Sequence, residues 1–298
     1  MTQTFDARRW WLLVGKHWSE NRKKYTLALI AIAGLLLLWY TVMLLSDGHR
    51  SMYPGVQVST YYTGLFIAGC LYGSMLFTDL GSKTRGLNYL VVPASHLEKL
   101  LCSLFYAVVV FFVCYTAIFY IVDIVMVKAA NAVAYSQWLK GHAAGDEFEP
   151  RKIANVFYQP AQSKAPEMLE YLLLLYFVIQ AIFIVGSVYF ARFSFIKTTI
   201  AALLTGLCIA FLIGKVILPI LPHGSYYRGI TSYHVYTVKE GITINGVTSG
   251  ISIYSDPATD KLITLPPWID DVLLFLLKFA FAPFLWLAAY FRLKEKEI

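Results

Sequence analysis

Ionisable side chains inside apolar stretches are the residues of this chain best placed to do chemistry. Lys278 follows Asp271 by seven residues, which is about 10 Å along a helix, and Asp123 stands near the end of another apolar run. Charge within a membrane is costly and often functional. Two interpretations stay open for Lys278: it forms a buried pair, with Asp123 as a candidate partner, or its long side chain reaches the outer interface. Lys278, Asp271 and Asp123 are therefore a candidate intramembrane charge site.

Sequence motifs for other chemistry are missing. The chain contains no GxxxxGK[ST], HExxH, CxxC or GxSxG, and its six histidines have no spacing typical of paired metal ligands. We therefore expect no catalytic residue, no metal site and no cofactor bound by this chain. The sequence does not predict an enzyme.

Composition indicates an integral membrane protein. Of the 298 residues, 58% are hydrophobic and only 14% are charged, whereas charged residues make up about a quarter of a soluble domain. The formal charge of +7 comes from basic residues at the ends of apolar segments rather than on one face. This placement indicates membrane topology and argues against nucleic acid as a partner.

The pattern of apolar segments predicts an all-α polytopic fold with six transmembrane helices. The transmembrane domain covers 25–298, and its predicted spans are 25–45, 58–78, 100–121, 168–190, 196–219 and 268–291. Two long loops, 128–167 and 221–267, separate spans three and four and spans five and six. In the second loop, Tyr233 to Tyr254 alternates and carries Asn245-Gly246, which predicts a small extramembrane β-rich element with a hairpin.

The first 24 residues form a separate predicted element. Trp10, Trp11 and Trp18 fall within nine residues and lie among six basic side chains. On a helix this gives an apolar sector opposite a basic one, which is typical of an amphipathic helix in the headgroup plane. A soluble tail is the alternative.

The distribution of Lys and Arg predicts the orientation. Fourteen lie in 1–24, 79–99, 191–197 and beyond 291, against nine in the loops on the other side. By the positive-inside rule both termini are cytoplasmic, and the two long loops are external. We expect a multi-pass protein of the plasma (inner) membrane.

Two small residues in the second predicted span permit close helix packing. Gly69 and Gly73 form a small-xxx-small pair. The pair could serve packing within one subunit or between two.

The segment from Asp79 to Leu101 interrupts two apolar runs and has unusual internal order. An apolar turn, Leu87 to Val92, is followed by Pro93, which fixes a bend. Ser95 is placed to cap the next helix, and Glu98 follows three residues later as its capping-box partner. The apolar turn is then free to make a contact. It either binds in the groove of a partner protein or packs under the lipid headgroups.

This segment resembles a known family. The run LVVPASHLEKLL, residues 90 to 101, is similar to the LLP-x-S-xx-EK-like segment that follows span two in ABC-2 type transporter permeases, and Lys83 to Gly86 are similar to the family's basic approach to it. The long, strand-like segment before span six departs from the short re-entrant helices of many members.

The resemblance implies the permease subunit of an ATP-driven ABC exporter, with ATP on a separate subunit. It implies an ABC ATPase as partner, docked on a coupling segment, and a homodimer or heterodimer of permeases in the bilayer. The residues expected to contact the ATPase are Lys83, Arg85, Leu87, Leu90, Val92, Pro93, Ser95, Glu98 and Lys99. The rival hypothesis is a noncatalytic membrane scaffold that binds an envelope partner through its external loops.

Overall fold

The computed structural model describes residues 5–47, 52–78, 94–141, 148, 150–157, 166–190, 192–212, 215, 226–227, 232–235, 238–241, 252–255, 261–264, 272 and 275–296. These residues divide into two units. The first holds residues 1–198 and 284–298, and the second holds Thr199–Pro283.

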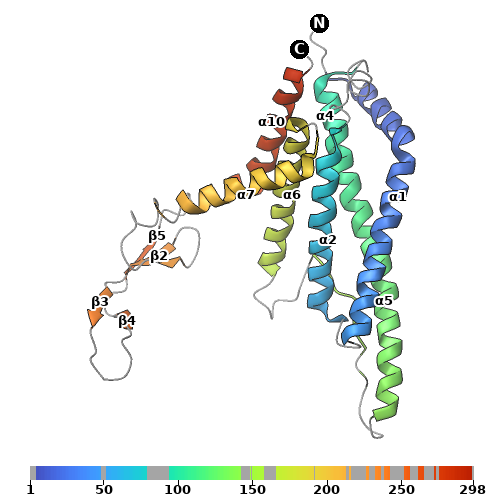
Figure 1. The fold of residues 1–298 in the computed structure, drawn as a ribbon, viewed down its shortest axis with the longest axis vertical. Coiled ribbons are helices and arrows are strands. Elements are labelled where there is room, and N and C mark those ends of the chain that lie inside the picture. The colour runs from blue at the N-terminus through green and yellow to red at the C-terminus, as the bar shows by residue number, and fades with distance from the viewer. Residues whose placement is uncertain are drawn as a thin grey trace. The chain divides into compact units, whose positions relative to one another are not determined.

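Helices make up the first unit (Figure 1). They are α1 (Ala7–Asp47), α2 (Pro54–Met75), α4 (His96–Leu104), the π-helix η3 (Phe105–Val110), α5 (Phe111–Gly141), α6 (Pro166–Tyr189) and most of α10 (Phe281–Lys296). The segments α4, η3 and α5 follow one another without a break, so the third predicted span is one long helix with a π turn inside it.

Three apolar clusters hold this unit together. Aromatic side chains dominate the largest, where α1, α2, α5 and α6 contribute Tyr40, Tyr61, Tyr115, Phe119 and Tyr176, each at most 1% exposed. In the second cluster, Ala289 and Leu293 of α10 pack with Leu100 of α4 and Ile184 of α6. The third joins Val14 of α1 to Cys102 and Tyr106. The start of α4 is therefore packed against α1, α6 and α10.

Four helical stretches are long and apolar enough to cross a membrane: Ala7–Ser46, His96–Ser136, Tyr171–Tyr189 and Ser194–Leu212. They contain or overlap the predicted spans one, three, four and five. The large apolar side chains exposed on α1, among them Leu27, Ile30 and Leu38, are what a bilayer would cover. The protein is a helical membrane protein.

The prediction of six spans is not confirmed, because two predicted spans are not among these four. Helix α2 has 22 residues, but Gln57, Ser59, Thr60 and Thr63 reduce its hydropathy. Helix α10 has 16 residues, fewer than the roughly 20 that a bilayer needs.

At two predicted boundaries the helix continues. Helix α1 runs unbroken through residues 24 and 25, so the predicted N-terminal helix is the first part of one 41-residue helix. Helix α5 continues to Gly141, about 30 Å beyond the predicted end of span three at residue 121. No Pro or Gly lies next to either boundary, so nothing local ends the helix.

The second unit contains most of α7 (Ser194–Leu212), five short strands and the π-helix η6 (Leu276–Ala280). The strands are β1 (Tyr226–Tyr227), β2 (Ser232–Val235), β3 (Val238–Gly241), β4 (Ser252–Ser255) and β5 (Lys261–Thr264). One sheet has the order β1-β2-β5 and the other pairs β3 with β4, all antiparallel. The predicted Asn245-Gly246 turn lies outside the described residues.

Candidate functional site at the start of α4

The first turn of α4 carries the capping box that the sequence predicts. The Ser95 side chain accepts a hydrogen bond of 3.2 Å from the Glu98 backbone N–H, and Glu98 Oε2 accepts one of 2.9 Å from the Ser95 N–H. Two helix-end donors are thereby satisfied reciprocally. The capping prediction is confirmed, and it fixes where the polar segment ends and the helix begins.

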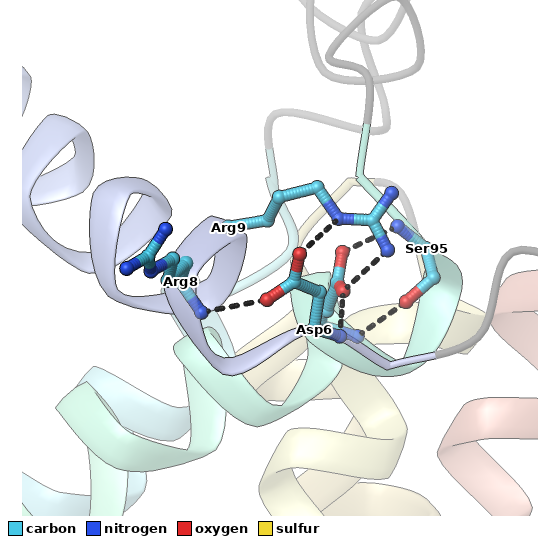
Figure 2. Close-up of polar contacts among 5 residues, drawn as sticks. Asp6, Arg8, Arg9 and Ser95 are labelled. Carbon is cyan, nitrogen blue, oxygen red and sulfur yellow. Dashed lines mark hydrogen bonds and ion pairs between the residues drawn. The ribbon is translucent and has the colours of Figure 1, made fainter.

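The same carboxylate binds the beginning of α1 (Figure 2). Glu98 Oε1 accepts a hydrogen bond of 2.8 Å from the Asp6 backbone N–H and one of 3.2 Å from Arg9 Nη2. Arg9 also lies 3.8 Å from the Asp6 carboxylate. Because Glu98 is fully buried, the loss of either partner would leave its charge less compensated. We call Asp6, Arg9, Ser95 and Glu98 the Glu98 cluster.

A second contact one turn deeper ties α1 to the third helix. The Tyr106 hydroxyl donates a hydrogen bond of 2.9 Å to the Val14 carbonyl. His17 lies over the Tyr106 ring, with 4.6 Å between ring centroids, and its Nε2 is 2.6 Å from the Tyr25 hydroxyl. The first part of α1 and the α4–η3 segment therefore pack as one body, which the sequence did not predict.

The predicted ATPase contacts divide into two groups. Lys83, Arg85, Leu87, Leu90, Val92 and Pro93 lie outside the described residues. Ser95, Glu98 and Lys99 are described, and all three are buried, at 8%, 0% and 4% exposure. Ser95 and Glu98 use their polar atoms within the chain, and contact of these residues with an ATPase stays a prediction.

The predicted charge site is described in part. Asp123 is fully buried in α5, and its Oδ1 accepts a hydrogen bond of 3.1 Å from the Tyr40 hydroxyl of α1. Its Oδ2 is buried without a hydrogen-bond partner. Asp271 and the Lys278 side chain lie outside the described residues, so the proposed pairs with Lys278 stay predictions.

An extended segment inside the first unit was missed by sequence reasoning. Residues 151–157 form no helix, yet Ala154 and Val156 are only 7% and 0% exposed. We call residues 151–157 the strap. Ala154 and Val156 belong to the same apolar cluster as residues of α2, α5 and α6.

Two amide side chains hold the strap by its backbone. Gln57 of α2 accepts from the Ala154 N–H at 2.7 Å and donates to the Lys152 carbonyl at 3.1 Å. Asn131 of α5 accepts from the Arg151 N–H at 2.8 Å and donates to its carbonyl at 3.0 Å. Each side-chain amide thus gives the strap backbone the hydrogen bonds that the peptide groups of a neighbouring strand would give in a sheet. Gln57 inside an apolar helix was the available signal, since a buried amide requires partners.

The glycine pair of α2 serves packing within the chain. A Cβ on Gly69 would lie 2.6 Å from the Tyr176 ring, and one on Gly73 would lie 3.4 Å from the Gln180 carbonyl oxygen. Both neighbours belong to α6. Of the two alternatives that the sequence left open, the described residues show the first.

Among the described residues, no group of three or more His, Cys, Asp or Glu side chains could hold a metal ion. No protein-family model, no curated protein and no solved structure matches this chain. Function therefore has to be argued from the geometry and from the sequence resemblance.

Proposed function

We propose that the chain is the membrane-spanning permease subunit of an ATP-driven ABC-type exporter. The 79–101 segment would couple it to a separate ATPase subunit, and two permeases would assemble in the plasma (inner) membrane with their termini cytoplasmic. The chain would carry no nucleotide site and no catalytic residue of its own.

The Glu98 cluster is the observation that supports this proposal best. A coupling segment transmits force only if it ends in a rigid helix that is tied to the rest of the membrane domain. The capping box provides the rigid start of α4, and the contacts from Glu98 Oε1 to Asp6 and Arg9 tie that start to α1. A displacement of residues 79–93 would then move α1 and the helix that begins with α4 together.

The proposal also completes the topology. In the proposed topology both termini are cytoplasmic, and α2 and the helix that ends as α10 each cross the membrane, which makes six spans. The polarity of α2 suits this role, because it packs against α6 and the strap rather than facing lipid on every side. The strap and the strand-containing segment would then be external.

Co-purification tests the proposal directly. The tagged chain, extracted from its native membrane, should bring down a P-loop ATPase, and the purified complex should hydrolyse ATP. L90D and V92D should abolish recovery of the ATPase. I153D is the matched control, since Ile153 is 47% exposed and lies on the predicted opposite side. An unchanged ATPase yield with L90D and V92D, or no ATPase with the wild-type chain, would contradict the proposal.

A second candidate function is a noncatalytic scaffold that binds an envelope partner. The paired strands of the second unit favour it, because they give the predicted external segment ordered backbone between α7 and η6. Deletion of residues 226–264 separates the two candidates. A scaffold would lose its external partner and have no ATPase, whereas the proposed permease would keep its ATPase.

A further inference from the structure

The π-helix η3 has a hydrogen-bond pattern that differs from the helices on either side. In an α-helix the Phe111 N–H would bond to the Ala107 carbonyl, four residues back. Here it bonds to the Tyr106 carbonyl, five residues back. The Ala107 carbonyl instead accepts a hydrogen bond of 2.7 Å from Gln180 Nε2 of α6.

This contact is entirely buried. Ala107 is 0% exposed and Gln180 is 1% exposed. A buried carbonyl without a donor is costly, so the Gln180 amide offsets much of what the π turn loses. Gln180 Oε1 is itself buried without a partner. Burial of the Gln180 side chain with its Oε1 unpaired is unfavourable, which indicates that the hydrogen bond from its Nε2 has a role.

A π turn contains one residue more than an α turn, and it therefore sets the register between the two halves of the helix. Conversion of η3 to α-helix would turn one half relative to the other by about 100° and shift it by about 1.5 Å. Both halves are tied to neighbours. Glu98 fixes α4 to α1, while Asp123 and the Tyr115 hydroxyl fix α5 to α1 and α2.

We propose that η3 is a one-residue register switch in the third membrane helix and that Gln180 is the positioning residue that selects its π form. Without the Gln180 bond, η3 returns to α-helix and α4 turns, because α5 has the larger buried anchor. Each α4 residue then takes the place of the residue before it. The inference concerns the packing of this chain and does not depend on the proposed permease role.

A deletion pair tests the first half of this inference. Removal of Val109 should convert η3 to α-helix and leave α4 and α5 in register, so the protein should fold and keep its melting temperature within a few degrees. Val125 is the control, because it is also a valine and is 54% exposed, against 48% for Val109. Its removal should misplace Asp123 or the residues after it and prevent folding. Equal damage from both deletions would show that η3 holds no removable residue.

A double-mutant cycle tests the role of Gln180. Q180L should lower the melting temperature in the full-length chain and have little effect in the chain that lacks Val109, because no π turn then needs the amide. An equal loss in both backgrounds would reduce Gln180 to a packing residue and overturn the proposal.

A cysteine at position 101 reports the turn of α4. Leu101 is 38% exposed, and the neighbouring Leu100 is 5% exposed. In a background without the four native cysteines, maleimide labelling of L101C should fall several-fold with Q180L, because residue 101 moves to the buried place of residue 100. Deletion of Val109 should restore the labelling. Unchanged labelling in Q180L would exclude the register switch.

Discussion

The Tyr40 hydroxyl of α1 donates a 3.1 Å hydrogen bond to Asp123 of α5, a residue 83 positions away. Both side chains are fully buried. The bond joins the two longest helices of the described chain in a region where an unpaired carboxylate is expensive.

Substitutions at this pair should have unequal effects on stability. Asp123→Asn keeps an acceptor for Tyr40 and removes a charge that is costly to bury, so the melting temperature should stay the same or rise. Asp123→Ala leaves the Tyr40 hydroxyl unsatisfied, at about 1–3 kcal/mol. Tryptophan fluorescence melts of the protein in nanodiscs give the comparison. If Asp123→Asn is as damaging as Asp123→Ala, the carboxylate has a charged role that the Tyr40 bond does not explain.

The Glu98 cluster predicts a different response at two adjacent arginines. Arg9→Ala removes the partner of a buried carboxylate and should increase hydrogen exchange of the first turns of α1 and α4. Arg8→Ala is the control, because only the backbone N–H of Arg8 enters the network, through Asp6 Oδ1. Glu98→Ala should do more than Arg9→Ala, since it also removes the hydrogen bonds from the Asp6 and Ser95 backbone N–H groups to the carboxylate. Equal exchange in Arg8→Ala and Arg9→Ala would mean that the ion pair contributes nothing measurable.

Sequence reasoning succeeded where the interaction is local. Ser95 and Glu98 are three residues apart, and the capping geometry follows from that spacing. The apolar runs that became α1, α6 and α7 were likewise visible, because membrane length and apolarity are properties of a continuous segment.

It failed where the cause lies elsewhere in the chain. The π turn depends on Gln180, which is 73 residues from Ala107, and the strap depends on Gln57, 97 residues from Ala154. Neither contact produces a periodic pattern in the sequence from which it could be predicted. The burial of Glu98 was missed for the same reason, since its partner Arg9 is 89 residues away.

The contact between α2 and α6 predicts a large effect from one methyl group. Gly69→Ala places a Cβ 2.6 Å from the Tyr176 ring, so the ring or the helices must shift at a cost of about 1–3 kcal/mol. Gly34→Ala, in α1, meets nothing within 4 Å and should be neutral or slightly stabilising. Thermal melts of the two variants are the measurement. If Tyr176→Leu fails to restore the stability of Gly69→Ala, the clash is not the cause.

The strap makes the topology testable from outside the cell. Ala154 is buried and Ile153, beside it, is 47% exposed. In a cysteine-free background, Ile153→Cys should react in intact cells with a maleimide that cannot cross the membrane, and Ala154→Cys should be protected. Gln57→Leu removes the amide that bonds to the Ala154 N–H and the Lys152 carbonyl, so it should raise labelling of position 154 and leave position 153 unchanged. Labelling of position 153 only after the cells are lysed would place the strap on the cytoplasmic side and reverse the predicted orientation of the whole chain.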